Sequence, residues 1–353
     1  MVNIFKKFKF KKYKKYVLLI TLLLIIFGIY RIYKFYYKYL RKNQIVFVGS
    51  TFEKNYEKEY TNNYFTKYKK TYFWDINNKK LDIIPKMSFE EYKKMKFKDK
   101  IPLVFYEGVS RNFHNNKNNE NVNNNTNVKN LVIYFGGNSE TMYSYSFVDY
   151  YYKNRITGEK IDTYLVGYPG YGCSYDEPTI ENFFKYSSNI AEFINTITDD
   201  KYDKIYIIGF SLGGFMAIDC ASKVNNKKVE SLTLINAFSN LKDCAKHIIT
   251  NNFSNKVDFL SNLVTFNFNK MDNAEQIKNI KMKLNIFYSS FDKSVDNKNS
   301  RILFDNAINC KDKNLYEVCG EHCQWDDSDI FKIIFGDEYS INTNNYYNAI
   351  KIN

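Results

Sequence analysis

One stretch of the sequence leaves few folds open, because an apolar run ends in a tight glycine turn with a serine at its tip. Residues 205–208 are β-branched or aromatic and predict a buried strand. The next five residues, Gly209–Gly213, read GFSLG and fit the pattern G-x-S-x-G. Small residues are needed on both sides of the serine where a strand turns sharply into a helix. Ser211 would then stand at a helix N-terminus, where backbone N–H groups stabilise negative charge.

Strands that alternate with helices surround this turn. Apolar runs predict strands at 131–135, 164–166, 231–235, 284–289 and 315–318. The intervening stretches predict helices at about 143–153, 179–198, 212–224, 297–308 and 327–335, with a mixed helical region at 239–280. This alternation predicts an α/β fold whose central sheet is mostly parallel and covered by helices on both faces. Two short runs, 45–48 and 103–106, are expected to belong to the first strands of the same sheet.

Aspartates that follow the later strands are candidate partners for the serine. Asp292 comes shortly after the strand predicted at 284–289. A carboxylate just past the carboxyl end of a strand can reach a histidine and fix its tautomer. Asp296 in the same loop and Asp243 after the preceding strand are the alternatives, and such an aspartate can also simply cap a helix. We choose Asp292 as the predicted acid.

Of the three histidines, His322 fits the order that such a site requires. It lies just past the last predicted strand and after Asp292. His114 precedes the regular part of the sheet, and His247 stands upstream of the acid in a predicted helix. Only His322 completes the chain order serine, aspartate, histidine. The alternative is a histidine in an ordinary surface turn.

A second glycine turn precedes the serine. Gly136–Ser139 follows the strand predicted at 131–135 and reads GGNS. Backbone N–H groups in such a loop can turn toward a developing oxyanion. We therefore predict that Asn138 or Ser139, together with Leu212, supplies the oxyanion hole. An ordinary strand-to-helix turn is the alternative.

The N-terminus combines a basic tail at 1–15 with an uncharged stretch, Tyr16–Tyr30. Fifteen helical residues span only about 22 Å of a hydrocarbon core of about 30 Å. Flanking basic side chains can snorkel, however, and aromatic residues extend the stretch. A cleaved signal peptide would need small residues at its cleavage site, and a buried core helix would not be flanked by dense lysine. The sequence thus predicts an uncleaved transmembrane signal anchor at 16–38.

Basic residues stand on both sides of the uncharged stretch Tyr16–Tyr30, seven before it and five in the dozen positions after it. This distribution favours a cytosolic N-terminus, as in a single-pass type II protein of the endoplasmic reticulum or secretory pathway. The N-glycosylation sequons at Asn124 and Asn252 agree with that orientation. The remaining body, 43–353, is expected to be one domain with an Asn-rich surface insertion at 112–130.

Charge and cysteine usage exclude two classes of protein. Residues 1–42 hold 12 of the 51 Lys and Arg and none of the 38 acidic residues, so the rest of the chain is nearly neutral. A nucleic-acid-binding body is therefore not expected. The six cysteines show no paired C-x-x-C spacing. We expect no zinc site, no other metal and no organic cofactor.

Four motifs resemble the α/β-hydrolase superfamily. They are Tyr134–Ser139 (YFGGNS), Gly167–Ser174 (GYPGYGCS), Ile208–Gly214 (IGFSLGG) and Asn236–Asp243 (NAFSNLKD). Within that superfamily they are similar to its single-pass membrane serine hydrolases, which include the bud-emergence homologues and neighbour the protein depalmitoylases. A glycine, Gly136, stands where that branch usually has histidine.

The resemblance and the residues together imply a membrane-anchored serine hydrolase. Ser211 would be the nucleophile, His322 the general acid and base, and Asp292 the residue that orients the histidine. The resemblance implies an acyl ester or thioester substrate, either a lipid or an acylated protein, met at a lipid bilayer. A serine peptidase of the same fold and a non-catalytic membrane interaction protein are the alternatives.

Overall fold

The computed structural model describes residues 21–31, 33–34, 69–83, 98–106, 130–138, 161–171, 174, 176–198, 200, 202–253, 270–325, 330–335 and 349–352. The chain divides into two compact units, residues 1–46 and residues 47–353.

In the first unit, residues 21–31 are helical, and their large apolar side chains are all more than half exposed. Across the described ranges, no helix has both the length and the apolar character that a membrane crossing requires. The predicted basic tail at 1–15 and the two ends of the predicted anchor at 16–38 lie outside those ranges.

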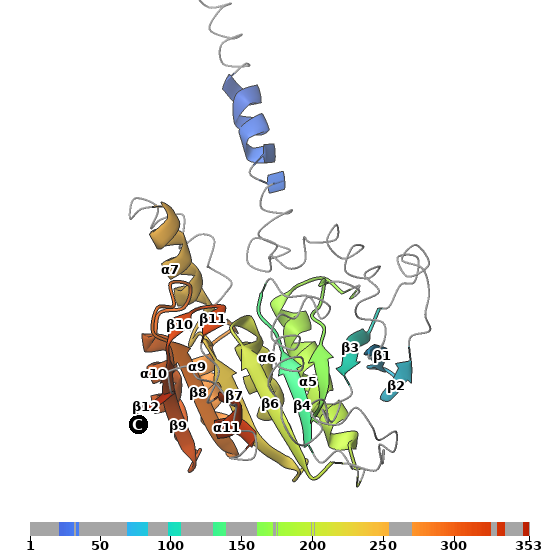
Figure 1. Ribbon diagram of the computed structural model, residues 1–353. Helices are drawn as coiled ribbons and strands as arrows, with labels where there is room; N and C mark the ends of the chain where they lie inside the picture. Colours follow the sequence, from blue (N-terminus) through green and yellow to red (C-terminus); the bar gives the residue numbers. More distant parts are fainter. Residues whose placement is uncertain are drawn as a thin grey trace, which may run out of the picture. The chain divides into compact units, whose positions relative to one another are not determined.

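The second unit is built on a sheet of ten described strands in the order β12-β9-β8-β7-β6-β4-β5-β3-β1-β2 (Figure 1). The strands are β1 Lys69–Asp75, β2 Lys80–Ile83, β3 Lys100–Tyr106, β4 Asn130–Phe135, β5 Ile161–Val166, β6 Lys204–Phe210, β7 Val229–Ile235, β8 Lys283–Ser289, β9 Lys313–Val318 and β12 Ile350–Lys351. The six strands β4 to β9 run parallel to one another. The edge strands β1, β2, β3 and β12 pair antiparallel.

The central strands are continuous apolar runs because helices cover both of their faces. All six residues of β4 are buried, as are the last six of β6. Near-continuous burial of this kind is typical of parallel strands in α/β proteins. The predicted parallel sheet is therefore confirmed. The register pairs Phe135 at the end of β4 with Gly209 near the end of β6, so both strands end side by side.

The antiparallel edge comes from the Lys- and Tyr-rich region between residues 69 and 106. The predicted run 103–106 lies in β3, whereas the run 45–48 is outside the described residues. Aromatic contacts hold this edge to the rest of the domain. The ring of Tyr72 lies 6.2 Å from that of Tyr164, and the Trp74 ring lies 5.3 Å from that of Phe193. Such pairs add about 0.5–1.5 kcal/mol each beyond the area that they bury.

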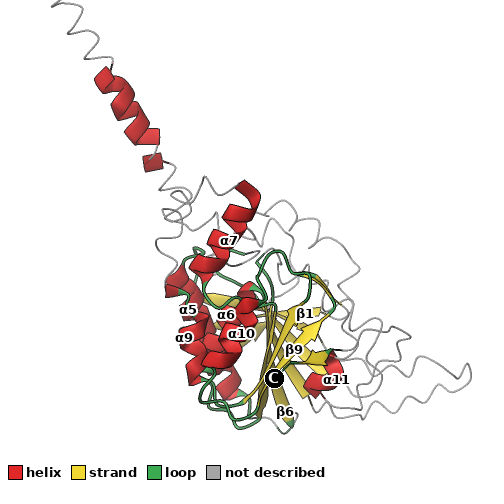
Figure 2. Cartoon of the chain, turned by 90° about the vertical axis from the view of Figure 1, so that its left-hand side faces the viewer, coloured by secondary structure: helices red, strands yellow, loops and turns green. Residues whose placement is uncertain are grey.

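Helices lie on both sides of the sheet (Figure 2). Figure 2 shows α5, α6, α9 and α10 on one side and α11 on the other. The described helices are α5 Ile180–Thr196, α6 Leu212–Ala221, α7 Leu241–Phe253, α9 Asn273–Gln276, the 3₁₀ turn η6 Ile277–Asn279, α10 Lys298–Asn306 and α11 Ile330–Phe335. All ten residues of α6 are buried, because this helix lies between the sheet and α5. The helix predicted at 143–153 and nearly all of the insertion at 112–130 fall outside the described ranges.

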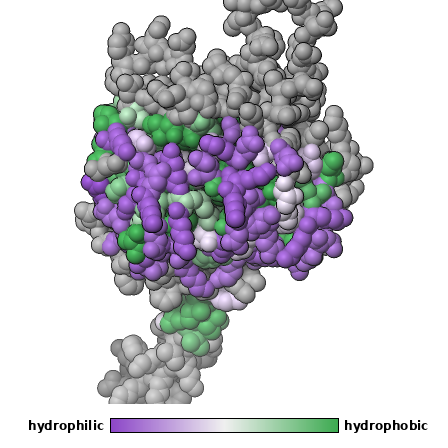
Figure 3. Space-filling view, turned by 90° about the horizontal axis from the view of Figure 1, so that it is seen from below, coloured by the Kyte–Doolittle hydropathy of each residue, from purple (hydrophilic) through white to green (hydrophobic). Residues whose placement is uncertain are grey.

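The surface of the second unit is mainly hydrophilic where Figure 3 views it from below. Surface ion pairs such as Lys204 with Glu230 (3.7 Å) contribute to this character. Exposed pairs of this kind stabilise a fold by less than about 1 kcal/mol. The stability of the domain therefore comes mainly from the apolar core between the sheet and its helices.

Candidate active site

The turn between β6 and α6 holds Ser211 in an unusual backbone conformation. Ser211 has φ 53° and ψ −115°, and its N–H donates to the Ile235 carbonyl at 2.9 Å. A residue with a side chain rarely adopts positive φ, and such a conformation costs of order 1–3 kcal/mol. The turn lifts the serine side chain out of the strand and places it at the first turn of α6.

Glycines make this turn possible because neighbouring backbone comes too close for any side chain. A Cβ added to Gly213 would lie 2.0 Å from the Phe135 carbonyl oxygen, and one on Gly209 would lie 2.6 Å from the Ala217 Cβ. On Gly214 it would lie 2.6 Å from the Ala237 Cβ. Small residues are needed here, as predicted, because α6 packs directly against the end of β4 and against Ala237 just after β7.

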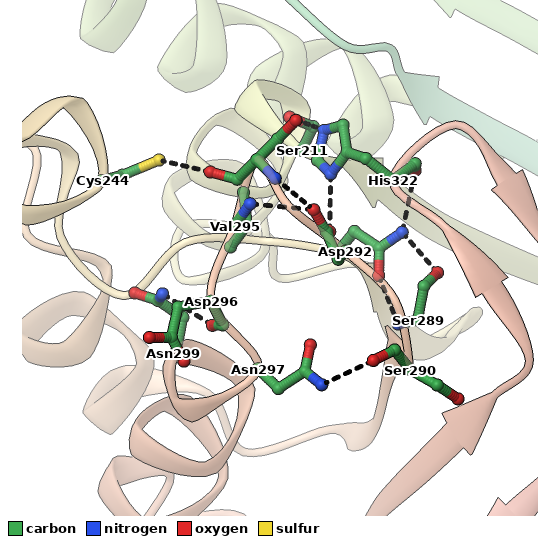
Figure 4. Close-up of polar contacts among 12 residues, drawn as sticks. Ser211, Cys244, Ser289, Ser290, Asp292, Val295, Asp296, Asn297, Asn299 and His322 are labelled. Atoms are coloured by element: carbon green, nitrogen blue, oxygen red, sulfur yellow. Dashed lines mark hydrogen bonds and ion pairs between the residues drawn. The ribbon is translucent and has the colours of Figure 1, made fainter. Parts of the chain in front are cut away.

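The structure brings Ser211, His322 and Asp292 together at the carboxyl ends of the strands (Figure 4). The His322 Nε2 lies 3.0 Å from the Ser211 Oγ, and its Nδ1 lies 2.6 Å from the Asp292 Oδ2. The His322 side chain is 17% exposed and that of Asp292 is 1% exposed. With Nδ1–H donating to the carboxylate, Nε2 is the acceptor that faces the serine hydroxyl. This arrangement can take a proton from the serine.

The other carboxylate oxygen of Asp292 is held by the main chain. The N–H groups of Ser294 and Val295 donate to Oδ1 at 2.8 and 2.9 Å. These bonds leave Oδ2 pointing at His322. Asp292 is therefore an acceptor of fixed orientation.

The rival acids Asp296 and Asp243, and His247, make other contacts or lie on another element. Asp296 pairs with Lys298 at 3.0 Å, and the Lys298 N–H and ammonium hold the pKa of this carboxyl below its usual range. Asp243 is exposed in the first turn of α7, and His247 lies in the same helix as predicted. His114 is outside the described residues.

Two of the predicted oxyanion donors are described, Leu212 at the start of α6 and Asn138 in the loop after β4. Leu212 is the first residue of α6, so its N–H has no carbonyl in a preceding turn of the helix. The close packing of Gly213 on the Phe135 and Gly136 carbonyls brings this helix start against the loop after β4. Asn138 is half-buried in that loop, and Ser139 lies outside the described residues.

Two tyrosines of the turn after β5 brace the same loop. The Tyr168 hydroxyl donates to the Gly136 carbonyl at 2.6 Å, and the Tyr171 hydroxyl donates to the Asn138 Oδ1 at 2.5 Å. Both tyrosines are nearly fully buried. The sequence motif that contains them had signalled only a turn, and its contact with the loop after β4 was not predicted.

Residues 130–262 match the family model described as alpha/beta hydrolase fold. The match covers β4 to α7 and includes the turn at Ser211. The chain has the alpha/beta hydrolase fold. Asp292 and His322 lie beyond the matched segment, after β8 and β9, and the tertiary structure brings them to Ser211.

Several solved structures are similar to this chain. An esterase of Pyrococcus furiosus is 12% identical, with a TM-score of 0.45, over 68% of this chain and 87% of its own. A peroxisomal alpha-beta-hydrolase of Saccharomyces cerevisiae is 11% identical, with a TM-score of 0.43, over 63% of this chain and 76% of its own. Acetyl xylan esterase 1 from Thermoanaerobacterium is 12% identical, with a TM-score of 0.41, over 63% and 74%.

Three residues around the site were not predicted from the sequence. Phe210, the residue before the serine, packs its ring 5.2 Å from that of His322. Cys244 is buried, and its Sγ donates to the Ser294 carbonyl at 3.9 Å. Burial, together with the charge of Asp292, raises the pKa of this thiol to about 12, so it stays protonated beside the site. Asn236, at the end of β7, contacts the main chain of His322 at 2.9 Å.

The signals for these residues differ. Phe210 stands within the G-x-S-x-G pattern, and Asn236 opens a motif that the sequence had already singled out. Their positions could therefore be found from the sequence, although their contacts with His322 could not. Cys244 lies in a plain helical stretch and gives no signal of its own.

Proposed function

We propose that this chain is a serine hydrolase that cleaves acyl esters or thioesters through a covalent acyl-enzyme. The observation that carries the proposal is the continuous contact from the Ser211 Oγ through the His322 ring to the Asp292 carboxylate, with distances of 3.0 and 2.6 Å. Nucleophile, base and orienting acid within hydrogen-bond reach are the mark of nucleophilic catalysis.

In the acylation step, the Ser211 Oγ attacks the carbonyl carbon while His322 Nε2 takes the hydroxyl proton. Asp292 stabilises the imidazolium that forms and stays ionised itself. Backbone N–H groups of Leu212 and of the loop at Asn138 and Ser139 receive the negative charge on the carbonyl oxygen. His322 then gives its proton to the departing alcohol or thiol.

In the deacylation step, water takes the place of the leaving group. His322 removes a proton from this water, which attacks the acyl carbon of the ester formed on Ser211. Collapse of the second tetrahedral intermediate returns the proton to the serine oxygen and releases the carboxylic acid. The cycle uses side chains and backbone groups of this chain alone.

Two features support an apolar acyl group on the substrate. Phe291, the chain neighbour of Asp292, is 61% exposed and presents an apolar ring to solvent. The sequence motifs also resemble those of the membrane serine hydrolases close to the protein depalmitoylases. A lipid ester or an S-acylated protein fits both features.

A membrane tether at residues 16–38 is part of the same proposal. The large apolar side chains of the helix at 21–31 are all more than half exposed, and dense lysine precedes it in the chain. Such a segment would hold the hydrolase at a bilayer that contains acylated lipids and proteins. Alkaline carbonate extraction of membranes should leave the full-length protein in the pellet, and release into the supernatant would contradict the tether.

The orientation of this tether has its own test. With a cytosolic N-terminus, the sequons at Asn124 and Asn252 face the lumen. Glycosidase treatment should then shift the mass of the wild-type protein and leave the double Asn→Gln variant unchanged. In sealed microsomes, the body of the protein should be protected from added protease. Cleavage of the body in these microsomes would show that the domain faces the cytosol.

Labelling with a fluorophosphonate probe tests the catalytic proposal. Folded wild-type protein should become labelled, with the adduct on Ser211 in the mass spectrum of its peptide. The variants Ser211→Ala and His322→Ala should stay unlabelled. Ser290→Ala is a matched control, because Ser290 lies near the site (Figure 4) and its hydroxyl donates to the Val318 main-chain carbonyl at 3.0 Å. A folded wild type that does not react would overturn the proposal.

The substrate class is tested on unlabelled wild-type protein, because the probe blocks Ser211. Hydrolysis of p-nitrophenyl esters from acetate to palmitate, and of a palmitoylated cysteine peptide, should show higher kcat/KM for longer acyl chains. Peptide amides should be cleaved slowly or not at all. Preference for a short peptide amide would replace the ester proposal with the peptidase alternative.

A further inference from the structure

The end of β7 contacts both partners of the proposed proton transfer. The last residue of the strand, Ile235, accepts the Ser211 N–H at 2.9 Å through its carbonyl. The next residue, Asn236, donates from its side-chain Nδ2 to the His322 carbonyl at 2.9 Å. Two consecutive residues therefore hold the main chain of the nucleophile and the main chain of the base.

His322 needs such an anchor because of the element that carries it. It lies in the turn between β10 (Gly320–Glu321) and β11 (Gln324–Trp325), which pair with each other in a separate two-stranded sheet. An isolated hairpin of two short strands is at best marginally stable in water. The position of the histidine therefore depends on contacts that the hairpin makes with the main sheet.

Asn236 is suited to this contact by its backbone as well as its amide. Its φ is 49°, a left-handed conformation in which asparagine is enriched several-fold over most residues with a side chain. Its N–H donates to the Phe287 carbonyl at 2.9 Å, which joins it to β8. The residue is 1% exposed, so water does not compete for its amide.

All of the amide takes part in hydrogen bonds. Besides the His322 carbonyl, Nδ2 donates to the Ser289 Oγ at 2.8 Å. The Ser289 N–H donates to the Asn236 Oδ1 at 2.8 Å. The amide thus joins the ends of β7 and β8 to the histidine turn, and Figure 4 shows Ser289 beside the main chain of His322.

We propose that Asn236 is a positioning residue that sets the distance between the His322 imidazole and the Ser211 hydroxyl. The inference rests on the proposed function, because it concerns the proton transfer of that reaction. Asn236 does not touch the reacting atoms and acts through the main chain of His322. A shift of about 1 Å in a catalytic group can cost about 100-fold in rate.

The two branches of the amide allow a matched comparison. Asn236→Gly removes the amide and keeps a residue that accepts positive φ. Ser289→Ala removes one partner of the same buried network and leaves the bond to His322 in place. Both variants lose a buried hydrogen bond and should melt at lower temperature than the wild type.

Their reactivity should separate them. In full-length protein, Asn236→Gly should react with the fluorophosphonate, and turn over p-nitrophenyl acetate, about 10- to 100-fold more slowly per folded molecule. Its KM should change by less than about 3-fold, because the histidine does not bind the ester in the ground state. Ser289→Ala should stay within about 3-fold of the wild type in both kcat and labelling rate.

Asn236→Asp tests the donor itself and serves if the glycine variant does not fold. The carboxylate has the same shape, tolerates positive φ and can accept from both the N–H and the hydroxyl of Ser289. It cannot donate to the His322 carbonyl when ionised. Its kcat at pH 8 should be as low as that of the glycine variant, and recovery to the wild-type value would overturn the proposal.

The outcomes distinguish this inference from the function on which it rests. A folded wild type that does not label overturns the proposed function and the role of Asn236 with it. A wild type that labels, with Asn236→Gly labelling as fast as Ser289→Ala, overturns the positioning role alone. A loss in kcat confined to the Asn236 variants supports it.

Discussion

Replacing Ser211 by glycine should leave the protein more stable to heat than replacing it by alanine, although both variants lose the hydroxyl. The reason lies in the backbone, since Ser211 has φ 53° and ψ −115°. Alanine keeps the Cβ that is crowded in this conformation, whereas glycine has none. The pair therefore isolates the backbone strain of the turn from the loss of the contact with His322.

The magnitude follows from two opposing terms. Strain at such a position costs about 2 kcal/mol, which glycine relieves. Glycine also loses about 0.7 kcal/mol relative to alanine, because its unfolded chain has more freedom. The net advantage of the glycine variant is about 1 kcal/mol in the free energy of unfolding. For a domain of this size that corresponds to a melting temperature about 2–4 °C higher.

The assay is thermal unfolding of the two full-length variants at the same scan rate. Ser290 offers the control, because it is a partly buried turn residue without positive φ. At this position the order should reverse, with Ser290→Ala melting above Ser290→Gly. If Ser211→Gly melts at or below Ser211→Ala, the turn stores no strain and the reasoning fails.

Four further predictions concern single residues. Asp292→Asn should lower kcat about 10³- to 10⁴-fold, because the amide no longer fixes the histidine tautomer, and a kcat within 10-fold of the wild type contradicts this role. Gly213→Ala should give little folded protein, because its Cβ would lie 2.0 Å from the Phe135 carbonyl oxygen; a melting temperature near that of the wild type refutes it. The pKa of Asp75 is lowered from 3.8 to about 2, mainly by the hydrogen bond from the Asn78 N–H. The ionised Asp75 carboxylate therefore stabilises the fold above about pH 4, and this stabilisation is lost as the pH falls toward 2. The free energy of unfolding of Asp75→Asn should fall less between about pH 4 and about pH 2 than that of the wild type. Acid-unfolding curves of the same shape for the two proteins would argue against this role of Asp75. The pKa of the Cys244 thiol, about 12, predicts that iodoacetamide at pH 8 modifies it only after unfolding; peptide mass spectra that show modification of native protein would disprove this.

The central part of the fold could be predicted because its signals are local. Strands such as β4 and β6 are buried on both faces, so their apolar runs are visible without any knowledge of neighbours. The antiparallel strands β1 and β2 were not predicted. Lys80 and Ile83 of β2 are exposed, and the Lys- and Tyr-rich composition of this region shows no continuous apolar run.

The candidate site was predictable to different degrees. Ser211 is marked by five consecutive residues, and His322 is singled out because the chain has only three histidines. Asp292 was chosen over Asp296 without a decisive local signal, since the two stand four residues apart in one loop. The N–H groups of Ser294 and Val295 that orient the Asp292 carboxylate are visible only in the folded loop.

The sequence by itself determined the turn at Ser211, because the glycines that its close backbone contacts require all lie within the five consecutive residues Gly209–Gly213. Only the tertiary structure decided which groups that serine meets. His322 stands 111 residues away and is held by Asn236 across 86 residues, and these contacts depend on how six parallel strands align their ends. Packing over such separations leaves no local pattern in the sequence. The distances from the His322 ring to the Ser211 Oγ (3.0 Å) and to the Asp292 Oδ2 (2.6 Å) are therefore fixed only by the assembled sheet.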